Sequence, residues 1–177
     1  MGRVPAAPRA ASAPPRRART APRPRAPAQP ARSGHTPLHL ACLSGREPDA
    51  RSLLARGADA GAATGGGWTP LHCAALKGHD GIVEALLGAG GADVAAETLL
   101  GCTPLFFAAH EGHCRTAELL LAAGASPDQF PAGGRSPVGI AAANGHGAVV
   151  DLLAAHGAAA VGAGEAAHHA AVASLRR

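Results

Sequence analysis

Aromatic side chains are scarce in this sequence: among its 177 residues there are three Phe, one Trp and no Tyr. A single large globular core usually buries more aromatic surface than four such rings supply. Small aliphatic residues and 24 glycines dominate instead. This composition argues against one large core and favours thin, repeated elements that pack closely through Ala and Leu.

Other absences exclude several classes of protein. The four cysteines form no CxxC pair, and no secretory signal is recognisable, so we expect reduced thiols rather than a disulfide framework. No apolar run approaches the roughly 20 residues that span a membrane. There is no Gly-x-Ser-x-Gly elbow, no phosphate loop with Lys and no His-Glu-x-x-His. We therefore expect a protein that is not an enzyme, takes no small-molecule substrate or cofactor, is monomeric, and is cytoplasmic or nuclear.

Charge divides the chain into two parts. Residues 1–33 carry eight Arg and no acidic residue (+8), whereas residues 34–177 carry eight basic and twelve acidic residues (−4), which together give the net +4. Eight prolines lie between Pro5 and Pro30, and proline disfavours helix. We therefore expect residues 1–33 to be a disordered arm. Three roles stay open for the arm: association with a polyanion or nucleic acid, an organelle-targeting peptide, or an inert linker.

Self-similarity at a fixed period begins at Gly34. The segment Thr36-Pro37-Leu38-His39 returns at residues 69–72, 103–106 and 136–139, at spacings of 33, 34 and 33. Two glycine markers keep the same register, and they stand at Gly45, Gly78, Gly112 and Gly145, and at Gly57, Gly90, Gly124 and Gly157. We predict repeats at 34–66, 67–100, 101–133 and 134–164, with the single extra residue, Gly91, in a loop. Residues 165–177 form a tail, in which 165–175 is a candidate capping helix.

Each repeat is predicted to hold two short helices. A Thr-Pro pair opens the first helix, because Thr caps an orphan N–H and Pro suits the first helical position. The second helix of repeat two carries Ile82, Val83 and Leu86 on one apolar stripe. Helices this short are marginal alone, so neighbouring repeats must stack to bury their stripes.

The Thr-Pro-Leu-His-x-Ala start at a 33-residue period resembles the ankyrin repeat. The resemblance implies an all-α solenoid of helix-turn-helix units, with β-hairpin loops between them and a concave face that binds a partner protein. The residues that match the structural motif are Thr36, Pro37, His39, Thr69, Pro70, His72, Thr103 and Pro104. In this family the motif histidine bonds to backbone and to the motif Thr. The third repeat departs from the motif at Phe106 and Phe107.

One feature of the family is missing from the loops. An Asp usually stands three residues before the Gly of the Gly-x-Thr-Pro start, and this sequence has Ala31, Thr64, Thr98 and Pro131 there. We expect Thr64 and Thr98 to make hydroxyl turns in its place.

Partner-binding residues are expected at loop tips and at the end of each first helix, as the resemblance implies. The candidates are Trp68, Leu76, Lys77, Leu99, Leu100, Cys102, His110, Glu111, Arg135 and Asn144. Trp68 and Leu100 are the leading anchors, since Trp is enriched at binding hot spots and an exposed Leu at a loop tip suggests contact. Trp68 has an alternative role, which is to cover the loop. The ten histidines do not predict a metal site, because no ligand set has zinc-finger spacing.

Overall fold

The structure is a computed structural model, and it describes residues 34–129 and 134–157. The arm, Pro131 and the predicted capping helix lie outside the described residues. Within the described ranges, no helix combines the length and the apolar character that a membrane crossing requires.

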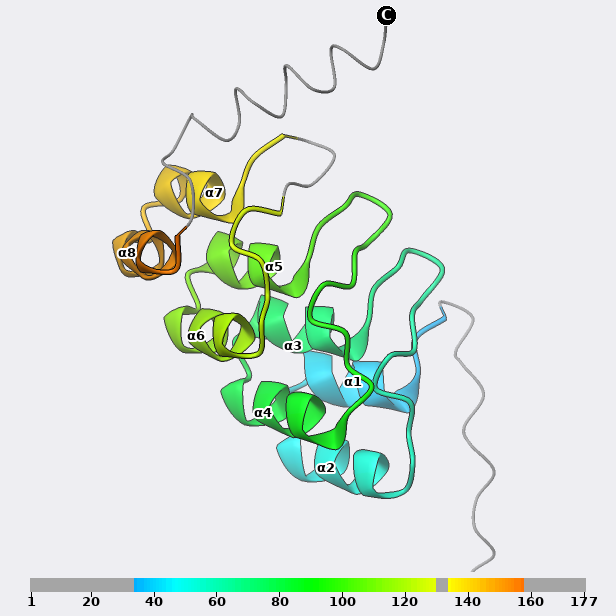
Figure 1. The fold of residues 1–177 in the computed structure, drawn as a ribbon. Coiled ribbons are helices and arrows are strands. Elements are labelled where there is room, and N and C mark those ends of the chain that lie inside the picture. The colour runs from blue at the N-terminus through cyan, green and yellow to red at the C-terminus, as the bar shows by residue number, and fades with distance from the viewer. Residues whose placement is uncertain (1–33, 130–133, 158–177) are drawn as a thin grey trace, which may run out of the picture.

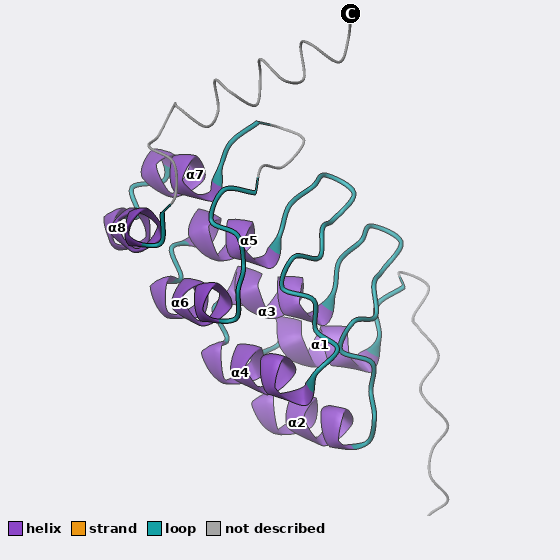
Figure 2. Ribbon diagram, viewed as in Figure 1, coloured by secondary structure: helices purple, strands orange, loops and turns teal. Residues whose placement is uncertain are grey.

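Eight helices fill the described residues, as four successive pairs. Their bounds are α1 Pro37–Leu43, α2 Glu47–Ala55, α3 Pro70–Lys77, α4 Asp80–Ala89, α5 Pro104–Glu111, α6 Cys114–Ala122, α7 Pro137–Ala143 and α8 Gly147–Ala155. The first helices of the pairs (α1, α3, α5 and α7) stack in one row, the inner row, and the second helices (α2, α4, α6 and α8) stack in another, the outer row. Long loops project from the stack on the side of the inner row (Figure 1). The all-α solenoid predicted from the sequence is confirmed. Its projecting loops contain turns but no strand within the described residues (Figure 2).

Hydroxyl side chains cap the first helix of every pair. Thr36, Thr69, Thr103 and Ser136 are extended N-cap residues, and each accepts a hydrogen bond from the backbone N–H three residues on. Proline occupies the start of each of these helices. The repeated Thr-Pro pair therefore fixes the start of the inner row, as the capping chemistry predicts.

The core consists of small aliphatic side chains contributed by adjacent repeats. In α4, Ile82, Val83 and Leu86 are buried, and Leu120 of α6 and Leu153 of α8 are buried at the matching places. In the outer row, a half-buried polar contact joins two repeats: Thr116 Oγ1 donates to Asp80 Oδ1 at 2.5 Å. Burial of the predicted stripe between neighbours is thus what holds the short helices together.

The turn between the two helices of a pair has no room for a Cβ. Gly78 ends α3 with φ of 66° in the left-handed region. A methyl group there would lie 2.5 Å from Nδ1 of His113, a residue of the next repeat. The same imidazole contacts the Leu76 carbonyl oxygen through Nε2, at 3.3 Å. Gly45 and Gly112 make space in the same way for His79 and His146 of the following repeats, whereas a Cβ on Gly145, in the last pair, would meet nothing within 4 Å.

Candidate functional site

A buried histidine attaches each of the first two inner helices to the loop of the next repeat. The Thr69 backbone N–H donates to His72 Nδ1 at 3.1 Å, and the Thr69 hydroxyl lies 2.8 Å from the same nitrogen. Because Nδ1 is an acceptor, the proton lies on Nε2, which donates to the Cys102 carbonyl oxygen at 3.1 Å. His39 repeats this arrangement, with its Nε2 2.9 Å from the Trp68 carbonyl oxygen. The hydrogen bonds that the family resemblance implies for both histidines are present.

Burial sets the charge of these two imidazoles. Desolvation is the main cause that lowers the pKa of His39 and the pKa of His72, although the hydrogen bond to a loop carbonyl opposes it in each case. Both side chains are fully buried. Neutral imidazoles at these positions keep one acceptor for the motif Thr and one donor for the loop.

Two threonine hydroxyls shape the loops. Thr64 Oγ1 accepts from the backbone N–H groups of Gly66 and Trp68, at 3.3 and 3.2 Å. Thr98 Oγ1 accepts from the Cys102 N–H at 3.2 Å. These hydroxyl turns replace the missing family Asp, as predicted, and they fix the backbone around Trp68.

The tips of neighbouring loops are also joined. The Leu99 N–H donates to the Gly66 carbonyl oxygen at 3.0 Å. This bond ties the loop that carries Leu100 to the loop that carries Trp68. The two loops therefore present their side chains together on the inner face of the stack.

A groove of about 460 Å³ lies on this inner face. Its lining is mostly apolar and comes from two loops and three inner helices, α3, α5 and α7. The lining residues are Gly66, Trp68, Leu76, Thr98, Leu100, Cys102, Phe106, Phe107, His110, Glu111 and Ile140. Three of the four large aromatic residues of the chain are in this set. We call this the aromatic groove.

The rings of the aromatic groove pack against one another. The centroids of Trp68 and Phe107 are 4.6 Å apart, and the rings are tilted by 34°. Phe106 meets Phe107 edge-on at 5.8 Å, and His72 meets Phe107 edge-on at 5.9 Å. Such contacts orient each ring. The groove thus has a preformed aromatic floor to which neighbouring repeats contribute.

Six of the ten candidate partner-binding residues line the aromatic groove, namely Trp68, Leu76, Leu100, Cys102, His110 and Glu111. Four do not: Lys77, Leu99, Arg135 and Asn144. Leu99 is 78% exposed at the loop tip. The Asn144 amide nitrogen donates to the His110 carbonyl oxygen at 2.8 Å, which gives Asn144 a role between repeats.

Cys102, one of the candidate partner-binding residues, is largely buried and does not project from its loop. Its side chain is only 8% exposed, and burial raises the pKa of its thiol. The Thr98 turn draws the backbone of Cys102 inward, next to the tip of His72. Cys102 therefore forms part of the groove floor and is not a projecting contact.

Phe106, Phe107 and Ile140 also line the groove, although none of them was among the candidates predicted from the sequence. Two signals pointed to them. Phe106 stands where the motif has His, so a ring that bonds to backbone is replaced by one that cannot. Ile140 follows Phe107 by 33 residues, so the two hold the same place in adjacent repeats.

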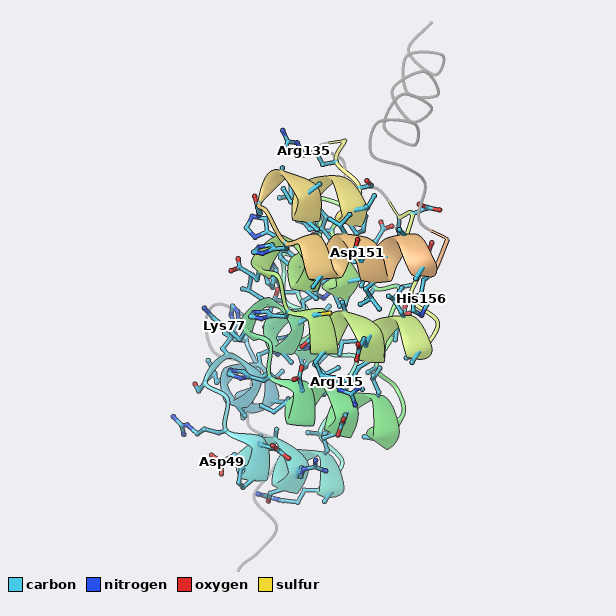
Figure 3. The ribbon with its side chains drawn as sticks, turned by 90° about the vertical axis from the view of Figure 1, so that its left-hand side faces the viewer. Asp49, Lys77, Arg115, Arg135, Asp151 and His156 are labelled. Atoms are coloured by element: carbon cyan, nitrogen blue, oxygen red, sulfur yellow. The ribbon has the colours of Figure 1, made fainter. Side chains whose placement is uncertain are left out.

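The charged side chains lie mainly outside the aromatic groove. Arg115 pairs with Glu118 at 3.0 Å and with Glu84 at 3.6 Å on the outer row. Figure 3 shows Arg115 and Asp151 over the outer helices and Lys77 at the edge of the stack. Within the groove lining, Glu111 is the only carboxylate, and it lies 2.9 Å from His110 Nδ1. The groove therefore offers apolar contact with one acidic group at its rim.

A model of the ankyrin repeat family, described as ankyrin repeats in three copies, matches residues 23–98 and again residues 50–131. The first match begins inside the Arg-rich arm, before the first described helix. None of the curated proteins compared with the chain matches it. The two family matches together cover residues 23–131, which is more than half of the chain, and repeats of this family generally mediate contacts between proteins. The chain belongs to the ankyrin repeat family.

Proposed function

We propose that this chain is a non-catalytic scaffold that binds a segment of a partner protein in the aromatic groove, on the concave face of the stack. The observation that carries the proposal is the concentration of scarce rings: Trp68, Phe106 and Phe107 all line one groove. In protein interfaces, a few residues supply most of the binding energy, and tryptophan and other aromatic residues are enriched among them. These three rings are half-buried, and apolar surface gathered in one groove is typical of a site where another protein binds.

The rim of the groove supports the same proposal. Leu100 is 69% exposed and stands on a loop held by backbone hydrogen bonds. A rigid loop loses little entropy when a partner packs against it. Leu76 and Leu100 line the same groove as the Trp68–Phe107 pair, so an apolar partner side chain bound there would find aliphatic and aromatic contacts together.

The test uses two exposed leucines on different faces. A partner is first recovered by affinity purification with the full chain, and its affinity for variants is then measured by calorimetry. Leu100→Asp should weaken binding by about tenfold or more, because it places a charge in an apolar contact. Leu40→Asp is the matched control, since Leu40 is 51% exposed but lies outside the groove. Equal affinities of the two variants would refute the groove as the binding site.

Trp68→Ala is a second variant for the same experiment. Its loss removes the largest ring of the groove, and we expect a loss of about tenfold or more in affinity. Circular dichroism checks that the helices persist, because Trp68 also packs against His72 and Phe107.

The arm supports a second candidate function, which is association with a polyanion. Eight Arg without an acidic residue in residues 1–33 could give a salt slope as steep as about −7 if each Arg met a phosphate. The arm contains no aromatic residue for base stacking, so sequence reading is not expected. Replacing the eight Arg with Gln should abolish heparin or DNA binding, whereas the partner should still bind in the aromatic groove. Retention of polyanion binding by that variant would refute this function of the arm.

A further inference from the structure

The arm carries a proline pattern that the repeats do not explain. Pro24, Pro27 and Pro30 follow one another at intervals of three residues, with Arg23 and Arg32 on either side. A polyproline II helix has three residues per turn, so the three rings would share one edge of such a helix. This conformation needs no internal hydrogen bonds and presents a stiff, preorganised ligand.

The described part of the chain begins close to the aromatic groove. Gly34 is the first described residue, and a Cβ on it would lie 3.3 Å from the Gly65 nitrogen and 3.6 Å from the Thr64 Cβ. The next residue of that loop, Gly66, lines the groove. Residues shortly before Gly34 are therefore covalently held near the groove, at a high effective concentration.

The groove has the chemistry that proline-rich segments require. Segments of this kind dock on grooves lined by aromatic rings, and here Trp68, Phe106 and Phe107 provide the rings. Arginine adds contacts by stacking on a ring face and by pairing with a carboxylate. Two carboxylates lie on this side of the stack: Glu111 in the lining, beside His110, and the exposed Glu97 on the loop of Leu100, which accepts a hydrogen bond from Gln129.

Residues 22–32 are long enough to follow the aromatic groove from end to end. Residues 22–32 in the polyproline II conformation span about 34 Å, at about 3.1 Å per residue. The groove crosses three inner helices, α3, α5 and α7. Packed helices are spaced by about 8–10 Å, so the two spacings from the first of these helices to the third add up to about 16–20 Å. One segment of eleven residues can therefore follow the whole groove.

The end of the stack is a poorer site for the same segment. A hollow of about 360 Å³ there includes the exposed Leu40, but it has no aromatic lining. Arg46 and Arg56 both line it, with Asp49 as the only acidic residue. An arm with eight Arg is repelled by a net positive rim. Charge and ring chemistry both favour the aromatic groove.

We propose that residues 22–32 of this chain occupy the aromatic groove and must leave it before a partner binds. The arm would thereby regulate partner binding, and this part of the proposal rests on the proposed function. Docking of the arm itself does not depend on any partner, so the two proposals can fail separately.

The experiment uses Trp68 as its reporter, since this is the only tryptophan of the chain. The full chain is compared with a variant in which Pro24, Pro27 and Pro30 are all replaced by Ala. The acrylamide quenching constant of the indole should rise about twofold in the variant, because a docked segment excludes solvent from the rings that it covers. The control replaces Pro5, Pro8 and Pro14 with Ala and should quench like the unmodified chain.

Equal quenching in all three chains would overturn the inference, and so would an equal rise in both variants. Dilution provides a further check. A difference that disappears on dilution would mean that the arm of a second copy fills the groove, which also overturns docking within one chain. If quenching is equal while Leu100→Asp still weakens partner binding, only the proposal about the arm falls. If the arm docks but Leu100→Asp leaves partner affinity unchanged, only the proposed function falls.

Discussion

His72 and Cys102 belong to different repeats, and the imidazole Nε2 of the first donates to the carbonyl oxygen of the second at 3.1 Å. The other ring nitrogen of His72 accepts from the backbone N–H of Thr69. One side chain thus connects the start of its own helix to the loop that forms a wall of the aromatic groove. The architecture of the site depends on this link between neighbours.

Replacing His72 with Ala should lower the free energy of unfolding by about 2–4 kcal/mol, because it leaves the Thr69 N–H and the Cys102 carbonyl without partners in a buried place. Urea denaturation followed by circular dichroism measures the change. His156→Ala is the control, since His156 is exposed and bonds only within its own helix. That substitution should change stability by no more than about 0.5 kcal/mol. Similar losses in the two variants would contradict a structural role for His72.

Acid should destabilise the fold through its buried histidines. Burial lowers the pKa values of His39 and His72 below the ordinary value of 6.5. As the pH falls through 6.5, the unfolded chain takes up protons at these positions while the folded chain does not, so the unfolded state gains relative stability. The free energy of unfolding should therefore decrease from pH 6.5 down to the folded-state pKa values and change no further there on account of these groups.

Denaturation midpoints at several pH values between 7.5 and 5 measure this slope. The His72→Ala chain should show a shallower dependence, because one of the two groups is gone. A stability that increases as the pH falls through this window would contradict the neutral state assigned to both imidazoles.

Leu86→Ala should cost about 2–5 kcal/mol of stability, through lost burial and the cavity left between repeats. Leu86 is fully buried between neighbouring outer helices, whereas Leu99 is 78% exposed. Leu99→Ala removes the same atoms from a loop tip, and we expect a change within about 0.5 kcal/mol. The urea midpoints of the two variants should differ clearly. Equal midpoints would contradict a core role for the apolar stripe that contains Leu86.

Two glycines should respond to alanine in opposite directions. Gly78→Ala forces a Cβ into a left-handed residue and against the His113 ring, so it should destabilise the protein by more than about 1 kcal/mol. Gly88 lies inside α4 with open space around it. Gly88→Ala should stabilise the protein by up to about 1 kcal/mol, since Ala favours helix more than Gly does. Thermal denaturation should thus show one midpoint falling and the other rising; a shift in the same direction would contradict this account.

Features that recur in every repeat could be predicted from the sequence. The Thr-Pro start, the apolar stripe around Leu86 and the chain-reversing glycines each follow from local chemistry, and repetition in register supports each assignment. Even the hydroxyl turn at Thr64 could be anticipated, because only a side-chain acceptor is needed there. Local chemistry is enough for these features since their partners are close along the chain.

The candidate site was harder to predict because it is built between repeats. Phe107 and Trp68 are far apart along the chain, and no periodic pattern indicates that their rings meet. The inward position of Cys102 depends on the His72 link and the Thr98 turn together, so its place in the loop misleadingly suggested exposure. Residues that break the motif, such as Phe106, indicated the site better than exposed positions did.

Phe106 has a mechanical consequence. It stands at the repeat position of His39 and His72 and has no polar atom with which to hold the loop that leads to Arg135. On the opposite side of the same junction, Asn144 and His146 both contact the His110 carbonyl oxygen, at 2.8 and 3.0 Å. The junction between the last two inner helices is therefore fastened by side-chain hydrogen bonds at the His110 end and lacks, at Phe106, the buried histidine bond that the two earlier junctions have.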